Sequence, residues 1–312
     1  MTSFDFNHYL ATRRAAIDRA LDRYVGEQQG QGHAVWRAMR YGLFPGGKRI
    51  RPILTLAAGE LFGAKHKLLM PFACALEMIH AYSIIHDDLP AMDDDDLRRG
   101  EPTAHRVFGE GMALLAGDGL LTEAFHIISA PQVARSVPSA LVLDLIHEIG
   151  HAIGAAGLVG GQAFDLEAEN KEVDLATVEY IHVRKTGALI LTVIRVGARA
   201  AGVKGTELRR VSRYGEFLGL AFQIADDILD VKGQTPPGER PESGRKERKK
   251  ATYPAVVGVV QAKERLKELL QQSLKQLSGF GAEAEHLRAM AHFVAGRALH
   301  EERNSKIPEI QF

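Results

Sequence analysis

Apolar residues recur along most of the chain at the three- and four-residue spacing of amphipathic helices. Between residues 6 and 25, for example, Leu10, Ile17, Leu21 and Tyr24 fall on one side and charged residues lie between them. Longer apolar segments cover 52–86, 112–128, 139–159, 174–201, 205–231, 254–278 and 283–301. Alternating strand patterns bounded by hairpin turns are nearly absent. The pattern predicts an all-α protein, a bundle of about ten helices.

Residues that break helices gather in three places, which are also the most charged: Pro45 to Gly47, Pro90 to Pro102, and Gly233 to Lys250. The third segment combines prolines, glycines and charges, which favours a lid-like loop rather than a linker between domains. With no internal repeat and no other boundary, residues 1–312 are expected to form a single domain.

Charge and cysteine content narrow the class of protein. The chain of 312 residues carries 39 basic and 39 acidic residues, which argues against a nucleic-acid partner. Glu77 and Arg195 interrupt the apolar runs, so no uncharged segment reaches the roughly 18 residues of a membrane span. The single cysteine, Cys74, and an N-terminus with charges before any apolar run favour a cytoplasmic protein.

A dense acidic cluster follows the apolar segment 52–86, with six aspartates among the ten residues 87–96. A solvated acidic loop is the simple interpretation. However, Asp87 and Asp88 end an apolar helix, and Pro90 prevents its regular continuation. The helix must bulge or stop there, which would bring Asp93 back beside Asp87.

A second cluster, Asp226, Asp227 and Asp230, lies within another apolar helical segment. Asp226 and Asp230 share a helix face, which destabilises a helix unless a cation compensates. Carboxylates suit magnesium, which usually binds through one or two of them together with substrate phosphates. Two facing clusters would therefore hold a diphosphate through bridging metal ions and stabilise its departure.

Basic residues complement these two clusters. Gly46-Gly47-Lys48-Arg49-Ile50-Arg51-Pro52 opens a helix, and both its glycines and the helix N-terminus favour an approaching anion. Arg98 and Arg99 follow the first cluster, Lys185 lies in a later helix, and Lys250 ends the proline-rich loop. Each cation alone could equally be an ordinary surface residue.

Together these motifs resemble the trans-prenyltransferase family of isoprenoid diphosphate synthases, particularly bacterial farnesyl diphosphate synthases. The resemblance covers about residues 30–300, and its motifs follow the family's order: GGKRIRP, HAYSIIHDDLPAMDDDDLRRG, GGQAFDLEAE, RKTGAL, FQIADDILD and KKATYP. It implies one all-helical domain around a deep central cavity, usually a homodimer. The implied reaction joins isopentenyl diphosphate to dimethylallyl or geranyl diphosphate.

The resemblance also implies roles for individual residues. About three magnesium ions, for which manganese could substitute, would be held by the two aspartate clusters. The metal residues are Asp87, Asp88, Asp93, Asp226, Asp227 and Asp230, supported by Gln162 and Asp165. The allylic diphosphate would be bound by Arg98, Lys185, Arg240 and Lys250. Isopentenyl diphosphate would be bound by Gly47, Lys48, Arg51, His80 and Arg99.

The implied chemistry needs no histidine or cysteine as base or nucleophile. Diphosphate leaves the allylic substrate, the isopentenyl double bond attacks the resulting cation, and a proton passes to the departed diphosphate. Thr186 and Gln223 would face the carbocation, which makes them catalytic residues with Arg98 and Lys185. One departure from the bacterial pattern is Arg245, which stands where the loop usually has an aspartate, while Arg240 replaces a lysine.

The length of the product is expected to depend on Tyr82 and Ser83, about one turn before Asp87. A tyrosine is large enough to block growth, whereas a serine is not. In the resembling synthases an aromatic residue here accompanies two extra residues in the aspartate motif, which are Pro90 and Ala91. The expected product is therefore farnesyl diphosphate, with geranylgeranyl diphosphate as the alternative.

Four other functions match the sequence less well. His147-Glu148-Ile149-Gly150-His151 matches the HExxH motif of zinc proteases, but Gly157 stands where a third histidine ligand would follow. Residues 42–48 match a P-loop until Arg49 replaces its serine or threonine. A terpene cyclase would not need the isopentenyl site. A non-catalytic partner subunit typically loses one aspartate cluster, whereas this chain keeps both.

Overall fold

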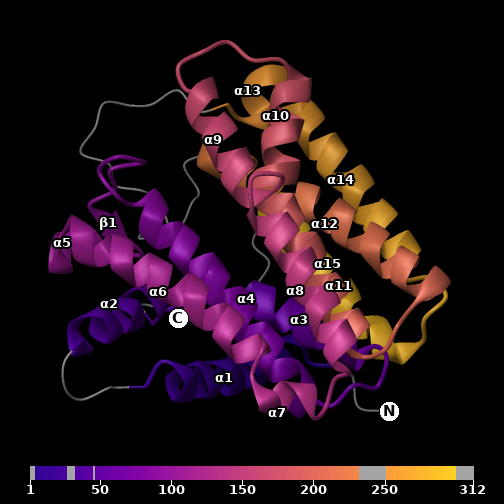
Figure 1. Ribbon diagram of the computed structural model, residues 1–312. Coiled ribbons are helices and arrows are strands. Elements are labelled where there is room, and N and C mark those ends of the chain that lie inside the picture. The colour runs from indigo at the N-terminus through magenta and orange to yellow at the C-terminus, as the bar shows by residue number, and fades with distance from the viewer. Residues whose placement is uncertain (1–3, 27–31, 45, 232–250, 300–312) are drawn as a thin grey trace.

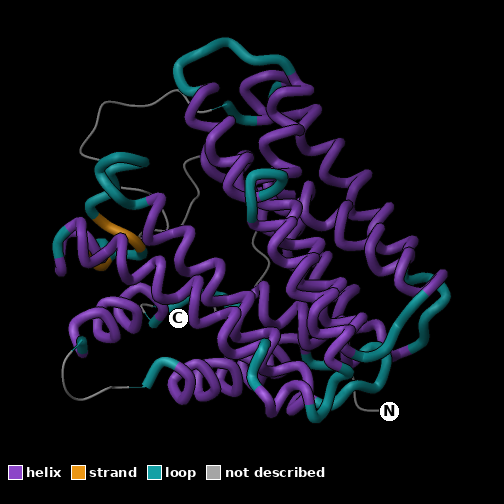
Figure 2. Tube along the Cα trace, viewed as in Figure 1, coloured by secondary structure: helices purple, strands orange, loops and turns teal. Residues whose placement is uncertain are grey.

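The computed structural model describes residues 4–26, 32–44, 46–231 and 251–299. In these ranges the regular elements are helices except for one short hairpin, and loops connect them (Figures 1 and 2). The helices are α1 (Phe6–Tyr24), α2 (His33–Leu43), α3 (Ile50–Glu60), α4 (His66–Asp87), α5 (Ala104–Phe108), α6 (Glu110–Ile128), α7 (Pro131–Ala134), α8 (Ser139–Ile153), α9 (Leu158–Ala168), α10 (Leu175–Ile181), α11 (Ala188–Ala200), α12 (Gly205–Val231), α13 (Tyr253–Val257), α14 (Val259–Gln276) and α15 (Glu285–Leu299). A π-helical turn spans His182–Gly187 and a 3-10 turn spans Ala282–Ala284. The prediction of an all-α protein is confirmed.

The number of helices exceeds the expected ten because the fold adds short ones that periodicity cannot detect. Among the described residues there are fifteen α-helices, of which α5, α7, α10 and α13 have only four to seven residues. Of the other eleven, nine coincide with predicted apolar segments, whereas α2 lies outside them and α9 overlaps the segment 139–159 only at its first two residues. Strands β1 (Leu97–Arg98) and β2 (Glu101–Pro102) pair antiparallel, with Leu97 opposite Pro102.

Three of the predicted helical segments are divided at or near a glycine. One is 254–278, where Gly258 adopts a φ of 84° between α13 and α14. The segment 52–86 becomes α3 and α4, because Gly63 adopts a left-handed φ of 77° and ends the helical path. Apolar Leu61 and Phe62 hide this break from a periodicity analysis. The segment 139–159 divides near Gly157, where a Cβ atom would lie 1.8 Å from the carbonyl oxygen of Ala152.

Helices α4 and α12 carry the two aspartate clusters, and both are deeply packed. Helix α4 is covered by α3 and α6, and α12 by α11, α14 and α15. On α4, for example, the side chains of Phe72, Leu76 and Ile79 have no exposed surface. The aspartates follow directly at the ends of these buried helices. Their carboxylates are therefore held by a rigid scaffold.

Three helical stretches are long and apolar enough to cross a membrane by length and composition alone: His66–Asp87, Glu110–Ala134 and Ser139–Ala168. For α4, 72% of the apolar window is buried inside the protein, so packing within the core explains its hydrophobicity. For the other two the buried share is only 39%. The absence of a membrane span therefore stays a prediction.

Candidate active site

The first aspartate cluster folds back on itself where α4 ends. The backbone N–H of Asp93 donates to the carbonyl oxygen of Asp87 at 2.8 Å, and that of Asp95 donates to Asp88 at 3.2 Å. Asp94 adopts a positive φ of 56°, which reverses the chain. The predicted return of Asp93 to Asp87 is confirmed, and the chain stops being helical just before Pro90.

Arg98 holds the returning loop against the end of α4. Its Nε donates to Asp88 Oδ1 at 3.0 Å, and its Nη2 donates to Asp95 Oδ2 at 2.8 Å. Asp88 and Asp95 are buried, so their charges need this partner. Arg98 is positioned by a hairpin turn in which Arg99 and Gly100 both have positive φ. The sequence analysis did not predict a role for Asp95. The Arg99-Gly100 turn, which positions Arg98, was the sequence feature that could have indicated one.

Burial and crowding raise the pKa values of the first cluster. Desolvation, opposed by Lys185 and reinforced by Asp93, raises the pKa of Asp87 to about 7. Desolvation also raises the pKa of Asp88 to about 6, although Arg98 opposes it. The folded protein therefore holds more negative charge here than its own cations compensate, which favours a bound cation.

Two close helix crossings bring the opposite wall of the site together at the π-helical turn. A Cβ on Gly161 of α9 would lie 2.3 Å from the backbone nitrogen of Lys185, and a Cβ on Gly219 of α12 would lie 2.9 Å from Gly187. Only glycine permits this approach. One turn further along each helix are Asp165 and Gln223, which consequently face the π-helical turn.

These crossings produce two polar pairs. Lys185 Nζ lies 2.7 Å from Asp165 Oδ2, and the hydroxyl of Thr186 donates to Gln223 Oε1. Burial alone would lower the pKa of Lys185, but Asp165 and Asp87 raise it above its usual value. The lysine therefore stays charged between Asp165 and the first cluster. A π-helical turn is common at functional sites, and sequence periodicity did not predict it.

The second aspartate cluster divides between two environments. Asp226 lies 3.3 Å from Arg297 of α15, and burial raises the pKa of Asp226 to about 6 despite this partner. Asp227 accepts the backbone N–H of Tyr253 at 2.6 Å and lies 3.2 Å from His182 Nε2. Asp227 thus fastens α12 to α13. The expected compensating cation is Arg297, which no sequence signal identified.

The second aspartate cluster, the π-helical turn and Arg98, which holds the first cluster, converge on a cavity of about 290 Å³. The polar residues that line it are Arg98, Asp165, His182, Lys185, Gln223, Asp226, Asp227, Asp230, Thr252 and Arg297. Gln162 lies behind Asp165, and neither its amide oxygen nor its nitrogen has a hydrogen-bond partner although both are buried. A buried amide without partners fits a polar ligand or water in this place.

The predicted isopentenyl diphosphate residues lie around the start of α3. Arg51 Nη1 lies 2.9 Å from His80 Nε2, and the Nη1 of Arg99 donates to the carbonyl oxygen of Gly46. A Cβ on Gly47 would lie 3.0 Å from the Arg99 guanidinium. Desolvation lowers the pKa of Arg51 to about 10 and lowers that of His80 well below its usual value. A half-buried Arg51 whose Nε is itself buried and without a partner suits an anionic ligand.

The residues fit magnesium of the kind that binds together with substrate. Among the described residues, no three carboxylate, imidazole or thiol groups converge closely enough to hold a metal alone. Asp87 and Asp93, with Asp226 and Asp230, instead offer pairs of hard oxygen donors on the two sides of the site. Magnesium characteristically completes such pairs with phosphate oxygens and water.

Three predicted loop residues, Arg240, Arg245 and Lys250, lie outside the described residues. Tyr82, predicted to limit product length, is buried against His86 in an edge-to-face contact with ring centroids 5.7 Å apart. Ser83 is also buried, and its hydroxyl donates to the carbonyl oxygen of His80 at 2.9 Å. Burial and the nearby Asp87 raise the pKa of Tyr82.

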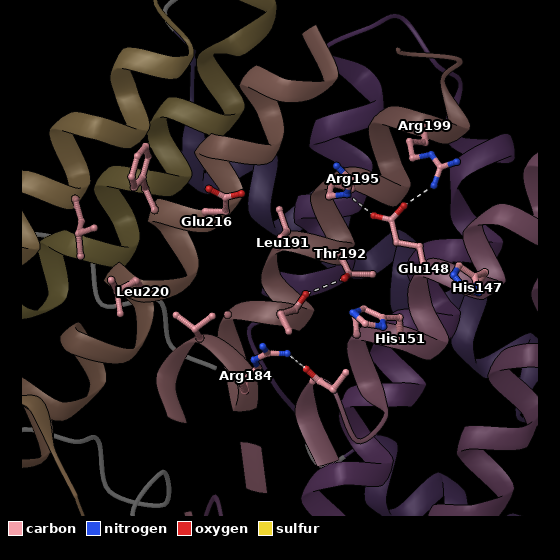
Figure 3. Close-up of a pocket in the computed structure, with 18 of the residues that line it drawn as sticks. His147, Glu148, His151, Arg184, Leu191, Thr192, Arg195, Arg199, Glu216 and Leu220 are labelled. Carbon is pink, nitrogen blue, oxygen red and sulfur yellow. Dashed lines mark hydrogen bonds and ion pairs between the residues drawn. The ribbon is translucent and has the colours of Figure 1, made fainter. Parts of the chain in front are cut away.

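The HExxH segment has a structural explanation. It lies on α8 beside a groove of about 920 Å³, where Glu148 forms ion pairs with Arg195 and Arg199 (Figure 3). Both carboxylate oxygens of Glu148 are engaged by these arginines, so the side chain is held as a structural ion pair and is not placed to activate a water molecule. The described residues offer no third ligand beside His147 and His151.

The site combines two opposed aspartate clusters with a lysine and arginines at a polar cavity in an all-helical bundle. This combination defines a diphosphate-binding enzyme of the isoprenoid synthase class. A model of the polyprenyl synthetase family matches residues 33–291, and the chain belongs to this family.

Named relatives agree with this assignment. A farnesyl diphosphate synthase of Escherichia coli is 45% identical over 94% of this chain and 99% of its own. A geranylgeranyl diphosphate synthase of Cyanophora paradoxa is 40% identical over 95% and 98%. The crystal structure of an FPP/GFPP synthase from Zymomonas mobilis superposes with a TM-score of 0.83 at 35% identity, covering 93% of this chain and 98% of that one.

The raised pKa of Asp87 predicts how stability depends on pH without metal. Between about pH 4 and 7 the folded protein keeps a proton that the unfolded chain has lost, so stability falls as pH rises through this range. At pH 8 Asp87→Asn should raise the free energy of unfolding by roughly 1–3 kcal/mol, because it removes a buried charge. Denaturant titrations in EDTA should show this gain shrinking toward pH 5. Glu172→Gln, in an exposed loop, should show no such trend.

Proposed function

We propose that this prenyltransferase makes farnesyl diphosphate from isopentenyl diphosphate and dimethylallyl or geranyl diphosphate. The observation that carries the proposal is the position of Lys185. Its Nζ lies 2.7 Å from Asp165 Oδ2, and the carboxylates of Asp165 and Asp87 raise the pKa of Lys185 above its usual value. It therefore links the two walls that hold the aspartate clusters. A relative named farnesyl diphosphate synthase, 45% identical along nearly its whole length, supports the substrate class.

Each group of residues has a distinct task in this proposal. Asp87, Asp88 and Asp93, with Asp226, Asp227 and Asp230, would hold magnesium, for which manganese could substitute. The metal supplies charge that stabilises the departing diphosphate. Arg98 and Lys185 would bind the allylic diphosphate. Asp88 and Asp227 would in addition fix Arg98 and α13, with which their carboxylates form close contacts.

The pair Thr186 and Gln223 is suited to a developing carbocation. Their hydrogen bond fixes the direction of two oxygen dipoles, of which that of Gln223 lines the cavity. Preorganised dipoles of this kind stabilise charge without reorganising during the reaction. Gly47, Lys48, Arg51, His80 and Arg99 would bind isopentenyl diphosphate, and the released proton would pass to the departed diphosphate.

Farnesyl diphosphate is the proposed product because Tyr82 is buried one turn before Asp87. A ring held against His86 leaves little room for a longer chain along α4. Geranylgeranyl diphosphate remains the second candidate, since a relative with that name is 40% identical over 98% of its length.

Removal of the metal provides the first test of this function. Product formation from labelled isopentenyl diphosphate should require magnesium or manganese and should cease in EDTA. Asp226→Ala should lower turnover by several orders of magnitude while circular dichroism stays unchanged, because the second aspartate cluster loses a principal ligand. Glu172→Ala is the matched control and should retain full turnover. An Asp226→Ala enzyme with normal turnover would falsify the two-cluster mechanism.

Product length provides the second test. Tyr82→Ala should shift the product from fifteen toward twenty carbons or more, since removing the ring deepens the cavity beside α4. Ser83→Ala changes the neighbouring position by a single oxygen and should leave the length unchanged. Chromatography of the dephosphorylated alcohols measures both. The same length in Tyr82→Ala as in wild type would mean that another residue forms the floor.

We further propose a cytoplasmic, single-domain chain that assembles as a homodimer through α6, α8 and α9. These helices expose large apolar side chains that packing within one chain does not cover: Leu114, Leu115, Leu143, Val159 and Phe164. The groove of about 920 Å³ beside α8 extends the same surface. Apolar patches of this kind usually mark an interface, and a symmetric dimer would cover both copies at once.

A pair of equally exposed residues tests the assembly. Leu143 on α8 and Val260 on α14 are both 67% exposed. Leu143→Glu should place a charge in the dimer interface and favour the monomer in sedimentation velocity at micromolar concentration. Val260→Glu should leave the dimer intact, since Val260 belongs neither to the exposed apolar residues of α6, α8 and α9 nor to the lining of the groove. Equal sedimentation of both variants as dimers would exclude this surface.

A further inference from the structure

A buried arginine sits in the middle of the basic segment and has no part in the proposed substrate contacts. Arg49 lies between Lys48 and Arg51, yet only 5% of its surface is exposed. A fully exposed or phosphate-binding arginine would keep its guanidinium near solvent. Its burial therefore requires a separate explanation.

The Arg49 guanidinium bridges three parts of the chain that are distant in sequence. Its Nη1 lies 2.8 Å from Glu77 Oε1 on α4, and its Nε lies 2.9 Å from Asp18 Oδ1 on α1. Its Nη2 donates to the carbonyl oxygen of Leu43, the last residue of α2, at 2.8 Å. The planar guanidinium fork makes all these bonds at once, which a lysine cannot do.

The backbone of Arg49 is as constrained as its side chain. With φ 51° and ψ 35° it adopts the left-handed conformation directly before the first residue of α3. Residues other than glycine adopt this conformation rarely and only where the surroundings enforce it. Here the buried ion pairs provide that enforcement. They fix the direction in which the chain leaves Gly47 and enters α3.

Helix α4 therefore contacts the basic segment at two points. Glu77 and His80 are three residues apart and share one face of α4. Glu77 binds Arg49, and His80 Nε2 lies 2.9 Å from Arg51 Nη1. Loss of the first contact would release the turn that carries Lys48 and Arg51, while both of these side chains would remain present.

We propose that Arg49, with Glu77 and Asp18, is a positioning residue that holds Lys48 and Arg51 in register to bind the diphosphate of isopentenyl diphosphate. This inference rests on the proposed function of that site. It predicts a specific effect on one substrate, which a general loss of stability would not produce.

Helix α3 offers a matched control at its other end. Glu60 is also a largely buried carboxylate that joins α3 to α1, because it accepts from Tyr9 and from Arg13, each at 2.9 Å. It lies eleven residues after Arg49, which is about 16 Å along the helix axis at 1.5 Å per residue. Glu60→Gln therefore weakens a comparable cluster without touching the basic segment.

Steady-state kinetics with both substrates varied tests the proposal. Glu77→Gln should raise KM for isopentenyl diphosphate at least about tenfold, while KM for geranyl diphosphate changes less than about twofold. Arg51→Ala serves as the positive control. Glu60→Gln should lower the Tm but leave both KM values unchanged. Unchanged KM values in Glu77→Gln would overturn the proposal.

Two further measurements keep the outcome decisive. If Glu77→Gln does not fold, Arg49→Lys is judged by the same criterion, because it keeps the charge and loses the fork. Calorimetric titration of isopentenyl diphosphate into each variant reads the site without turnover. A wild-type enzyme that binds this ligand but forms no prenyl product would refute the proposed function alone. A Glu77→Gln variant with wild-type affinity would refute the positioning role alone.

Discussion

The burial of aspartates at the ends of apolar helices is the constraint on which the rest of the structure depends. An unpaired buried carboxylate costs several kcal/mol. Arg98 pairs with Asp88 and Asp95, Lys185 lies between Asp165 and the first cluster, and Arg297 meets Asp226. Even so, burial leaves the pKa of Asp87 near 7. The incomplete compensation is what makes the site receptive to a metal–diphosphate ligand.

Close backbone contact provides the geometry that this electrostatic arrangement needs. Gly161 and Gly219 allow α9 and α12 to press on the π-helical turn from two sides. Asp165 and Gln223 follow these glycines by one turn, so the crossings that pack the bundle also orient the polar pairs. A side chain at either glycine would separate Lys185 from Asp165 or Thr186 from Gln223. Packing and chemistry are therefore coupled at the same positions.

The arginines divide into those that bind the fold together and those that remain available to ligands. The guanidinium of Arg49 is engaged in ion pairs with Glu77 and Asp18 and in a hydrogen bond to the end of α2. Arg51, two residues later, has a neutral histidine as its near partner and an Nε without any partner. The difference between the two arginines depends on the side of the turn from which each side chain emerges. Motif reading treats both as equivalent cations.

The sequence alone determined the helical class, because apolar periodicity persists whenever one face of a helix is buried. It also determined the aspartate clusters and the return of Asp93 to Asp87, since Pro90 leaves the chain no helical path. Tertiary structure decided the division of 52–86 at Gly63, the π-helical turn at Lys185, and the roles of Asp95, Arg297 and Arg49. The π-helical turn and the roles of Arg297 and Arg49 arise from contacts between residues tens of positions apart. Local spacing carries no information about such contacts, because they depend on how whole helices cross.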